Sequence, residues 1–308
     1  MSNTVKNYLS LVKFSHTIFA MPFALIGFSL GLVKGDFKQT NLNNSIGGGF
    51  DITNFIFRQK IGFKFLLVLI CMISARSAAM AFNRYLDRNF DAKNPRTAIR
   101  EIPAGIISAN SALRFVILSS VIFVIAAFFI NAICFALSPV ALFVVLFYSY
   151  TKRFTALCHL VLGLGLSLAP IGAYLAVTGR FDVLPLLFSL AVIFWVSGFD
   201  IIFALQDVDF DQSQHLYSIP SVLGKAKGLR VSELLHLVSA GCIIIAGFYG
   251  HFHWLYWMGV LVFIAMLIYQ HSIVKPNDLS KVNLAFMTAN GIASVVFAMF
   301  VIGDLFFG

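Results

Sequence analysis

Nine apolar runs follow one another along the chain, separated by shorter polar and charged stretches. Each run is close to the roughly 20 residues that a helix needs to cross about 30 Å of hydrocarbon. They lie at about residues 15–34, 61–83, 112–130, 132–150, 155–177, 183–205, 231–249, 254–272 and 283–306. The pattern predicts an all-α polytopic membrane protein, with nine transmembrane helices around a central cavity and a polar cap on the cytoplasmic side.

The longest polar stretch near the N-terminus is the insert at residues 35–59, G-D-F-K-Q-T-N-L-N-N-S-I-G-G-G-F-D-I-T-N-F-I-F-R-Q. Its Asn and Gly content predicts a loop between the first two spans. We treat residues 1–308 as a single domain.

Composition supports a membrane protein without a large soluble domain. Hydrophobic residues make up 59% of the chain and charged residues 11%, whereas soluble domains carry about 25% charged residues. No basic, aromatic-interleaved soluble module is present, which argues against a nucleic-acid partner. The four cysteines lie in apolar segments without a CxxC pair, so they predict small core residues and neither a disulfide framework nor a zinc site.

The net charge of +9 is distributed unevenly over the loops. With nine spans, the N-terminal segment and the loops after spans two, four, six and eight share one face, and most Lys and Arg residues lie there. Such a bias marks the cytoplasmic face, and it favours contact with lipid headgroups.

An acidic cluster ends the second span. Asn83, Asp87 and Asp91 are four residues apart, so a continuous helix places them on one face, which Arg76 and Met80 extend into the apolar run. Three oxygen-bearing side chains at a membrane boundary suit Mg²⁺, which often bridges protein carboxylates and substrate phosphates. The alternative is a charged, solvated loop between two spans.

Basic residues follow at two places. Arg96 and Arg100 come after the acidic cluster, and planar guanidinium groups suit phosphate. Tyr148, Lys152 and Arg153 lie at the cytoplasmic end of the fourth span. The second group fits either diphosphate neutralisation or ordinary positive-inside anchoring.

A second acidic cluster ends the sixth span. Asp200, Asp207 and Asp211 have helical spacing i, i+7 and i+11 and so share one face, whereas Asp209 does not. Asp200 lies well inside the apolar run, where an ionisable group is costly and is therefore taken as functional. Two such clusters, four spans apart on one predicted side, suggest an internal repeat of about 10–150 and 151–275.

Five segments resemble, in the same order, motifs of the UbiA superfamily of intramembrane prenyltransferases. N-R-Y-L-D-R-N-F-D (83–91) is similar to NDxxDxxxD, and R-T-A-I-R-E-I-P-A-G (96–105) to RTxxRPLPSG. The other three are Y-S-Y-T-K-R-F-T-A-L (148–157), similar to YPxxKRxTxxP, D-I-I-F-A-L-Q-D-V-D-F-D (200–211), similar to DxxYAxxDxxxD, and Y-S-I-P-S-V-L-G (217–224), similar to SIPxxLG.

Two positions depart from these motifs. Arg84 replaces the Asp that follows the Asn in NDxxDxxxD, which removes one possible ligand. Phe203 replaces the Tyr of DxxYAxxDxxxD, which removes a phenol. The stretch most resembles the 4-hydroxybenzoate polyprenyltransferase branch. The opening F-S-H-T-I-F-A-M-P-F-A-L-I-G is especially similar to the enzymes of that branch that prenylate a naphthoate in menaquinone synthesis.

The resemblance implies Mg²⁺-dependent transfer of a polyprenyl group from its diphosphate to 4-hydroxybenzoate or a dihydroxynaphthoate in ubiquinone or menaquinone biosynthesis. One Mg²⁺ would be held by Asn83, Asp87 and Asp91, and a second by Asp207 and Asp211. Asp87 and Asp207 are thereby expected to be catalytic. Asp200 is the candidate for activating the phenol or taking the proton.

The substrates would meet basic and apolar groups. Arg96, Arg100, Lys152 and Arg153 would stabilise the charge on the departing diphosphate. Lys13 and Arg76 would pair with the aromatic carboxylate, with Tyr148 also in the aromatic site. A Phe-rich cavity would shield the allylic carbocation from water, and the polyprenyl tail would reach the lipid through a lateral opening.

Alternatives remain at this point. Buried acidic residues and repeats also fit a secondary transporter, and a UbiA-type enzyme with another acceptor is possible. A CDP-alcohol phosphotransferase is disfavoured because its DGxxAR signature is missing. The predicted partners are polyprenyl diphosphate, an aromatic acid and membrane lipid, and no obligate protein partner is evident. The predicted location is the cytoplasmic membrane of a bacterium, with the site loops facing the cytoplasm.

Overall fold

The structure is a computed structural model that describes residues 3–12, 19–35 and 52–308, together with the backbone alone at the start of its longest helix. In those ranges the regular structure is helical, apart from an isolated bridge between Lys275 and Asp278. The long helices are α2 (Met21–Lys34), α4 (Ile52–Asp91), α5 (Ala109–Ile130), α6 (Ala132–Thr151), α7 (Cys158–Thr178), α8 (Val183–Ala204), α11 (Lys225–Tyr249), α12 (Trp254–Ile273) and α13 (Asn290–Phe307). The predicted all-α class is confirmed.

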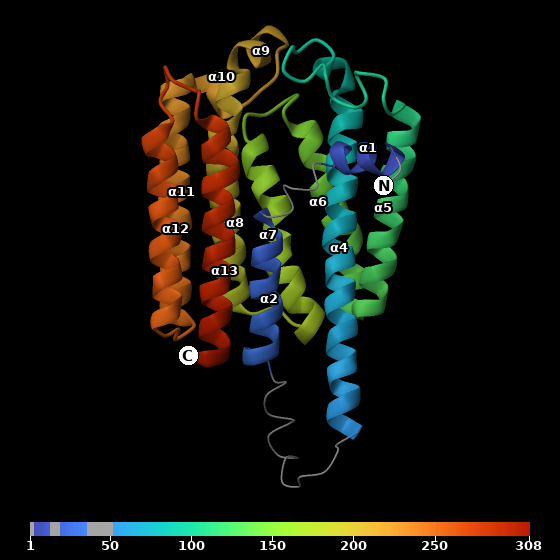
Figure 1. Cartoon of the computed structure of the whole chain (residues 1–308), viewed down its shortest axis with the longest axis vertical. Coiled ribbons are helices and arrows are strands. Elements are labelled where there is room, and N and C mark those ends of the chain that lie inside the picture. The colour runs from blue at the N-terminus through green and yellow to red at the C-terminus, as the bar shows by residue number, and fades with distance from the viewer. Residues whose placement is uncertain (1–2, 13–18, 36–51) are drawn as a thin grey trace.

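Shorter elements complete the chain. They are α1 (Asn3–Leu11), the 3₁₀ turn η2 (Leu205–Asp207), α9 (Val208–Ser213), α10 (Ile219–Leu223) and the π-helical turn η3 (Leu284–Ala289). Figure 1 shows α9 and α10 at one end of the bundle, above α8 and α11, which places them in a cap at that end.

Eight described helical segments are long and apolar enough to cross a membrane. They correspond to the second to ninth predicted spans. The first predicted span, 15–34, is represented by α2, which has 14 residues, while residues 13–18 lie outside the described part of the chain. The described residues therefore support a polytopic membrane protein and do not by themselves establish a ninth full span.

The prediction of a loop over residues 35–59 is wrong for its last part, because α4 begins at Ile52 and runs for 40 residues. The Gly-rich part of the insert precedes Ile52 and lies largely outside the described residues. Residues 52–59 contain no Gly or Pro, so no helix breaker separates them from the apolar run that follows.

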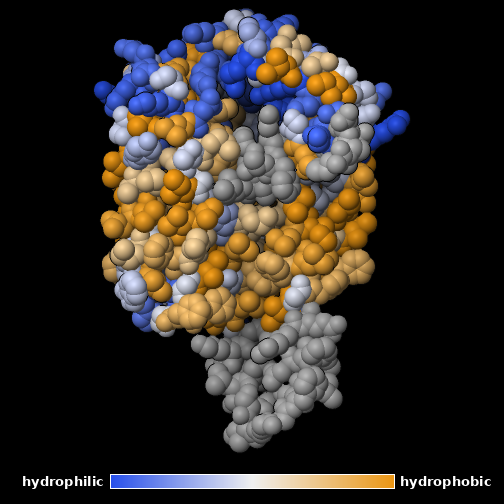
Figure 2. Space-filling model, in the orientation of Figure 1, coloured by the Kyte–Doolittle hydropathy of each residue, from blue (hydrophilic) through white to orange (hydrophobic). Residues whose placement is uncertain are grey.

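The helices form a bundle in which α4, α5 and α6 lie on one side and α11, α12 and α13 on the other (Figure 1). Between them, α7 packs against α2, α6 and α8, while α8 packs against α11 and α13 packs against α2 and α12. Figure 2 shows a broad apolar belt around the visible face and a hydrophilic end above it. This division of surface is the one that a lipid bilayer requires.

Two glycines allow α7 to pack closely against α2 and α8. A Cβ added at Gly27 of α2 would lie 2.0 Å from the carbonyl oxygen of Pro170 in α7, and one at Gly163 of α7 would lie 2.4 Å from that of Ile193 in α8. Small residues let membrane helices approach closely enough for van der Waals packing, which drives their association where apolar burial gives no advantage over lipid. The central position of α7 therefore depends on Gly27 and Gly163.

One residue joins α5 to α6. The side chain of Asn131 accepts a hydrogen bond from the backbone N–H of Cys134 at 2.8 Å and so caps α6. Its amide nitrogen donates to the carbonyl oxygen of Leu175 in α7, also at 2.8 Å. Asn131 thus both turns the chain and holds the α5–α6 hairpin against α7.

The second acidic segment is not one continuous helix, and this corrects the prediction that Asp200, Asp207 and Asp211 share a single helical face. The α-helix α8 ends at Ala204, the 3₁₀ turn η2 follows, and α9 begins at Val208. A change from α to 3₁₀ alters the rotation per residue, so spacing along the sequence no longer defines the face. The predicted repeat of 10–150 and 151–275 stays a prediction.

Candidate active site

The first acidic cluster lies on the last turns of α4, which continues without interruption to Asp91. Asn83, Asp87 and Asp91 consequently stack along one side of that helix, as their spacing predicts. The amide nitrogen of Asn83 donates to Oδ2 of Asp87 at 3.2 Å. Asp87 is only 1% exposed and Asp91 5% exposed, so both carboxylates require nearby positive charge or donors.

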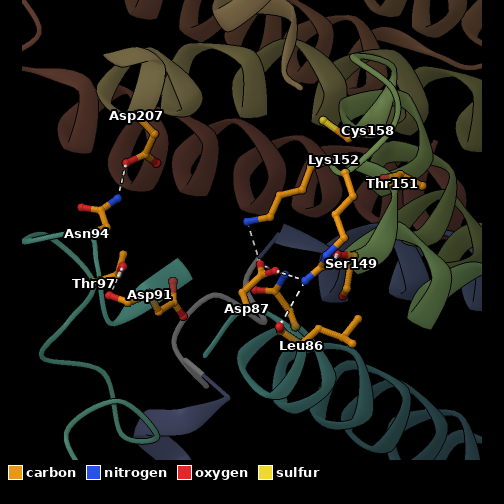
Figure 3. Close-up of polar contacts among 12 residues, drawn as sticks. Leu86, Asp87, Asp91, Asn94, Thr97, Ser149, Thr151, Lys152, Cys158 and Asp207 are labelled. Carbon is orange, nitrogen blue, oxygen red and sulfur yellow. Dashed lines mark hydrogen bonds and ion pairs between the residues drawn. The ribbon is translucent and has the colours of Figure 1, made fainter. Parts of the chain in front are cut away.

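Two cations from the end of α6 neutralise Asp87. Lys152 Nζ lies 2.7 Å from Asp87 Oδ2, and Arg153 Nη2 lies 3.0 Å from Oδ1. Arg153 also donates to the carbonyl oxygen of Leu86 at 3.1 Å. Figure 3 shows Lys152 reaching toward Asp87, which receives polar contacts from two directions. The loop after α6 and the end of α4 are thereby held together by charge.

Arg100 forms an ion pair with Asp91. Arg100 Nη1 lies 2.7 Å from Asp91 Oδ1, and the hydroxyl of Thr97 donates to the Asp91 backbone carbonyl at 3.1 Å. Oδ2 of Asp91 is buried and has no hydrogen-bond partner among the described residues. Such an orphaned carboxylate oxygen is uncommon, because an unpaired buried acceptor is costly.

The loop after α4 reaches across to the second cluster. Arg96 forms a two-point contact with Asp207, in which Nε donates to Oδ1 at 3.0 Å and Nη2 contacts Oδ2. The amide nitrogen of Asn94 also donates to Asp207 Oδ1, at 3.3 Å. Figure 3 shows Asp207 and Asn94 together, with Asp91 below them and Asp87 toward the centre. The two acidic segments therefore belong to one site.

Asp211 and Asp209 differ sharply in their surroundings. The hydroxyl of Ser218 donates to Asp211 Oδ2 at 3.1 Å, which ties α9 to the start of α10. Asp209 has a side chain that is 90% exposed, and its Oδ2 lies 3.8 Å from Lys225 Nζ. The sequence-based separation of Asp209 from the other aspartates is consistent with this position.

Asp200 lies near the end of α8 with its side chain 24% exposed, and Oδ2 is 2.7 Å from His159 Nδ1. An aspartate in an apolar run that retains some exposure can contact a bound molecule.

An apolar cavity of about 390 Å³ extends away from these polar groups between α4, α5, α6 and α7. Arg76, Met80 and Tyr148 line it together with small and branched apolar side chains. Nε of Arg76 is buried and has no hydrogen-bond partner among the described residues. The cavity therefore combines an apolar wall with a guanidinium nitrogen that has no hydrogen-bond acceptor. This arrangement is expected of a site that binds an amphipathic acid.

The donor chemistry fits Mg²⁺. Asn83, Asp87 and Asp91 supply one amide oxygen and carboxylate oxygens, including the unpartnered Oδ2 of Asp91, and Asp207 and Asp211 supply further carboxylates. Within the described ranges no group of three His, Cys, Asp or Glu side chains converges as a complete metal site. Mg²⁺ usually takes one or two protein carboxylates and completes its octahedron with water and substrate phosphate, so the oxygen donors of either acidic segment are of the type that it binds.

The sequence interpretation missed three polar residues that shape this site. Asn94 bonds to Asp207, His159 bonds to Asp200, and Ser218 bonds to Asp211. Asn94 and Ser218 lie next to or within quoted motifs and could have been selected for that reason. His159 has no such signal, because its partner is 41 residues away in sequence. Lys13, predicted to contact the aromatic carboxylate, lies outside the described residues.

A family comparison decides the wider class. Residues 57–292 match the model of the UbiA prenyltransferase family. The chain belongs to this family. The predicted fold class and the prediction of a prenyltransferase enzyme are both confirmed.

Relatives and solved structures agree with this membership. This chain is 31% identical to a 4-hydroxybenzoate octaprenyltransferase of Tolumonas auensis, and the alignment covers 72% of this chain and 78% of that protein. It is 28% identical to one of Francisella tularensis subsp. novicida, over 77% and 83% respectively.

Among solved structures, an apo UbiA homologue from Aeropyrum pernix superimposes with a TM-score of 0.73 at 26% identity, covering 93% of this chain and 95% of that one. A UbiA homologue from Archaeoglobus fulgidus bound to GPP and Mg²⁺ gives 0.65 at 17% identity, covering 97% and 99%. The latter likeness shows the shared fold.

Proposed function

We propose that this UbiA-family enzyme transfers a polyprenyl group from polyprenyl diphosphate to an aromatic carboxylic acid, with 4-hydroxybenzoate as the first candidate acceptor. The names of the two relatives support this acceptor. We place the enzyme in the cytoplasmic membrane of a bacterium with the polar cap facing the cytoplasm, because the loops at that end carry most of the Lys and Arg residues.

The observation that carries the proposal is the pairing of carboxylates with cations. Asp87, Asp91 and Asp207 each contact Lys or Arg side chains that are suited to phosphate. A diphosphate with its counter-cations presents both signs of charge, so it can replace these internal ion pairs. Carboxylates would then face Mg²⁺, while Arg96, Arg100, Lys152 and Arg153 would face phosphate oxygens.

Asn83, Asp87 and Asp91 would hold one Mg²⁺ and Asp207 and Asp211 a second. The bound ions would supply charge neutralisation for the leaving diphosphate. Asp87 and Asp207 are the two of these ligands that we propose as catalytic. The four cations would add hydrogen bonds to the same oxygens, and such preorganised donors are usually a large part of catalysis.

The acceptor would lie where the polar groups meet the apolar cavity. Arg76 would bind its carboxylate through the unused guanidinium donors, and Tyr148 would pack beside the ring. Lys13 stays a predicted second partner of that carboxylate. Asp200 would take the proton of the phenol, and the apolar wall would exclude water from the carbocation.

The test uses purified protein in lipid nanodiscs with Mg²⁺ and polyprenyl diphosphates of several lengths. Either 4-hydroxybenzoate or dihydroxynaphthoate is offered, and products are identified by mass spectrometry. We expect a C-prenylated 4-hydroxybenzoate, lost when EDTA replaces Mg²⁺. Prenylation of the naphthoate alone would reassign the acceptor, and diphosphate-independent solute uptake into vesicles, without any prenylated product, would overturn the proposal in favour of a transporter.

A further inference from the structure

A buried histidine connects Asp200 to the segment that holds the second acidic cluster. His159 is the second residue of α7 and is 2% exposed. Its Nδ1 lies 2.7 Å from Asp200 Oδ2, and its Nε2 lies 3.3 Å from the backbone nitrogen of Ile219. The two ring nitrogens therefore contact different parts of the chain.

The backbone contact determines the tautomer. The N–H of Ile219 can only donate, so Nε2 of His159 must be the unprotonated, accepting nitrogen. The ring proton then resides on Nδ1, which donates to Asp200. This hydrogen bond holds the Asp200 carboxyl group in one orientation, with Oδ2 directed at the imidazole.

The residues next to Ile219 contact two other parts of the site. Ser218 donates to Asp211 Oδ2 at 3.1 Å. The backbone N–H of Tyr217 donates to the carbonyl oxygen of Lys152 at 2.7 Å, and Lys152 in turn pairs with Asp87. Residues 217–219, which we term the linking segment, thus contact His159, Asp211 and the loop that carries Lys152.

We propose that His159 is a positioning residue, which orients Asp200 and couples it to the second acidic cluster through the linking segment. The inference rests on the proposed function for the role of Asp200 as base. With Oδ2 engaged by His159, Oδ1 is the oxygen that the 24% exposed side chain can present to the acceptor.

In the proposed step, Asp200 accepts one proton and diphosphate leaves with one electron pair. Asp200 Oδ1 takes the proton of the acceptor hydroxyl while the ortho ring carbon forms a bond to the prenyl carbon. The prenyl C–O bond breaks, and its electron pair leaves with diphosphate. The ring C–H proton is lost to the diphosphate or to water as Asp200 returns its proton to the phenol oxygen, which restores the aromatic ring.

Two substitutions separate the two contacts of His159. In His159→Asn, the amide nitrogen occupies about the place of Nδ1, so the donor to Asp200 is kept and the acceptor for Ile219 is lost. In His159→Gln, the amide group reaches about the place of Nε2, so the acceptor is kept and the donor to Asp200 is lost.

We expect His159→Gln to lower kcat by about 10²-fold, in the range of a general-base contribution, with KM for polyprenyl diphosphate unchanged. His159→Asn keeps the donor to Asp200, so its kcat should stay within about threefold of wild type. In the absence of acceptor, Mg²⁺ and geranyl diphosphate together should raise the Tm of wild type, and this rise should be smaller in His159→Asn. The matched control is His236→Asn, a buried histidine bonded to His271, which should leave kcat and the ligand-induced rise in Tm unchanged.

Equal losses of kcat in the Asn and Gln variants, or an unchanged kcat in His159→Gln, would overturn the inference. The Tm measurement uses no acceptor, so it separates this inference from the proposed function. If wild type prenylates no aromatic acid, the acceptor and the base role of Asp200 are both wrong. A reduced Tm rise confined to His159→Asn would still establish the coupling through residues 217–219, and an equal rise in both variants would refute it.

Discussion

The two acidic clusters reach the same site by different means. The first is carried by one unbroken helix, α4, in which Asp87 and Asp91 are almost fully buried. The second is spread over the end of α8, a 3₁₀ turn and the short helix α9, and the side chain of Asp207 is 19% exposed. One continuous helix fixes the backbone of the first cluster, whose carboxylates also pair with nearby cations. The second cluster lacks such a helix, and contacts with Arg96, Asn94 and Ser218 position it.

The positions of the two clusters therefore depend on different residues. A cluster built into a helix tolerates loss of a neighbour, because its backbone stays in place. A cluster on a broken segment depends on side chains that come from elsewhere in the chain. Substitution of the carboxylates should therefore be severe in both, and substitution of supporting residues should matter mainly for the second.

The largest effect is expected for the carboxylates themselves. Asp87→Asn and Asp207→Asn should each lower prenyl transfer by about 10³-fold or more, because each removes a charge that faces the metal and diphosphate. Asp209→Asn is the matched control, since its side chain is 90% exposed, and it should change the rate by less than about twofold. Initial rates of product formation measure the effect, and size-exclusion profiles check folding.

Activity above a tenth of wild type in either Asp87→Asn or Asp207→Asn would remove that residue from the site. An equally large loss in Asp209→Asn would show that total acidity of the cap matters more than the two clusters.

A smaller effect is expected for the support of the second cluster. Asn94→Ala removes a hydrogen bond to Asp207 and leaves the N–H of Arg96 without its side-chain acceptor. If the lost hydrogen bonds lower the stabilisation of the transition state by about 1 kcal/mol, kcat/KM falls roughly five- to tenfold. Titration of the rate against Mg²⁺ should show a weaker response.

The control for this prediction is Gln214→Ala. Gln214 accepts a hydrogen bond from Lys93 at 3.2 Å, an exposed contact between the same two segments that touches no carboxylate. Its loss should leave the Mg²⁺ titration unchanged. A similar decrease in both variants would mean that general loop attachment, and not the position of Asp207, sets the rate.

The smallest effect is expected for Phe203→Tyr, which restores the residue of the family motif. The Phe203 ring lies 5.3 Å from the Arg96 guanidinium and 4.3 Å from the Phe286 ring, so it already supports Arg96 through its π face. We expect kcat/KM within about threefold of wild type, since both rings offer that face. A tenfold rise in steady-state assays would show that a phenol at this position has a function that the stacking does not supply.

Local sequence patterns are enough to predict the membrane class, eight of the spans and the helical face shared by Asn83, Asp87 and Asp91. Apolar length and helical periodicity are local properties, so the printed order of residues is enough to define them. The same reasoning failed at α8, because the change to a 3₁₀ turn after Ala204 is not marked by any Gly or Pro in the sequence.

The pairing of charged residues depends on the tertiary structure and could not be predicted from the sequence pattern. Arg96 and Asp207 are 111 residues apart, and His159 and Asp200 are 41 residues apart, so no periodicity relates them. Their contacts follow from the packing of α7 between α6 and α8 and from the reach of the loop after α4. Partners brought together by packing are a property of the whole bundle, and for that reason a local pattern does not contain them.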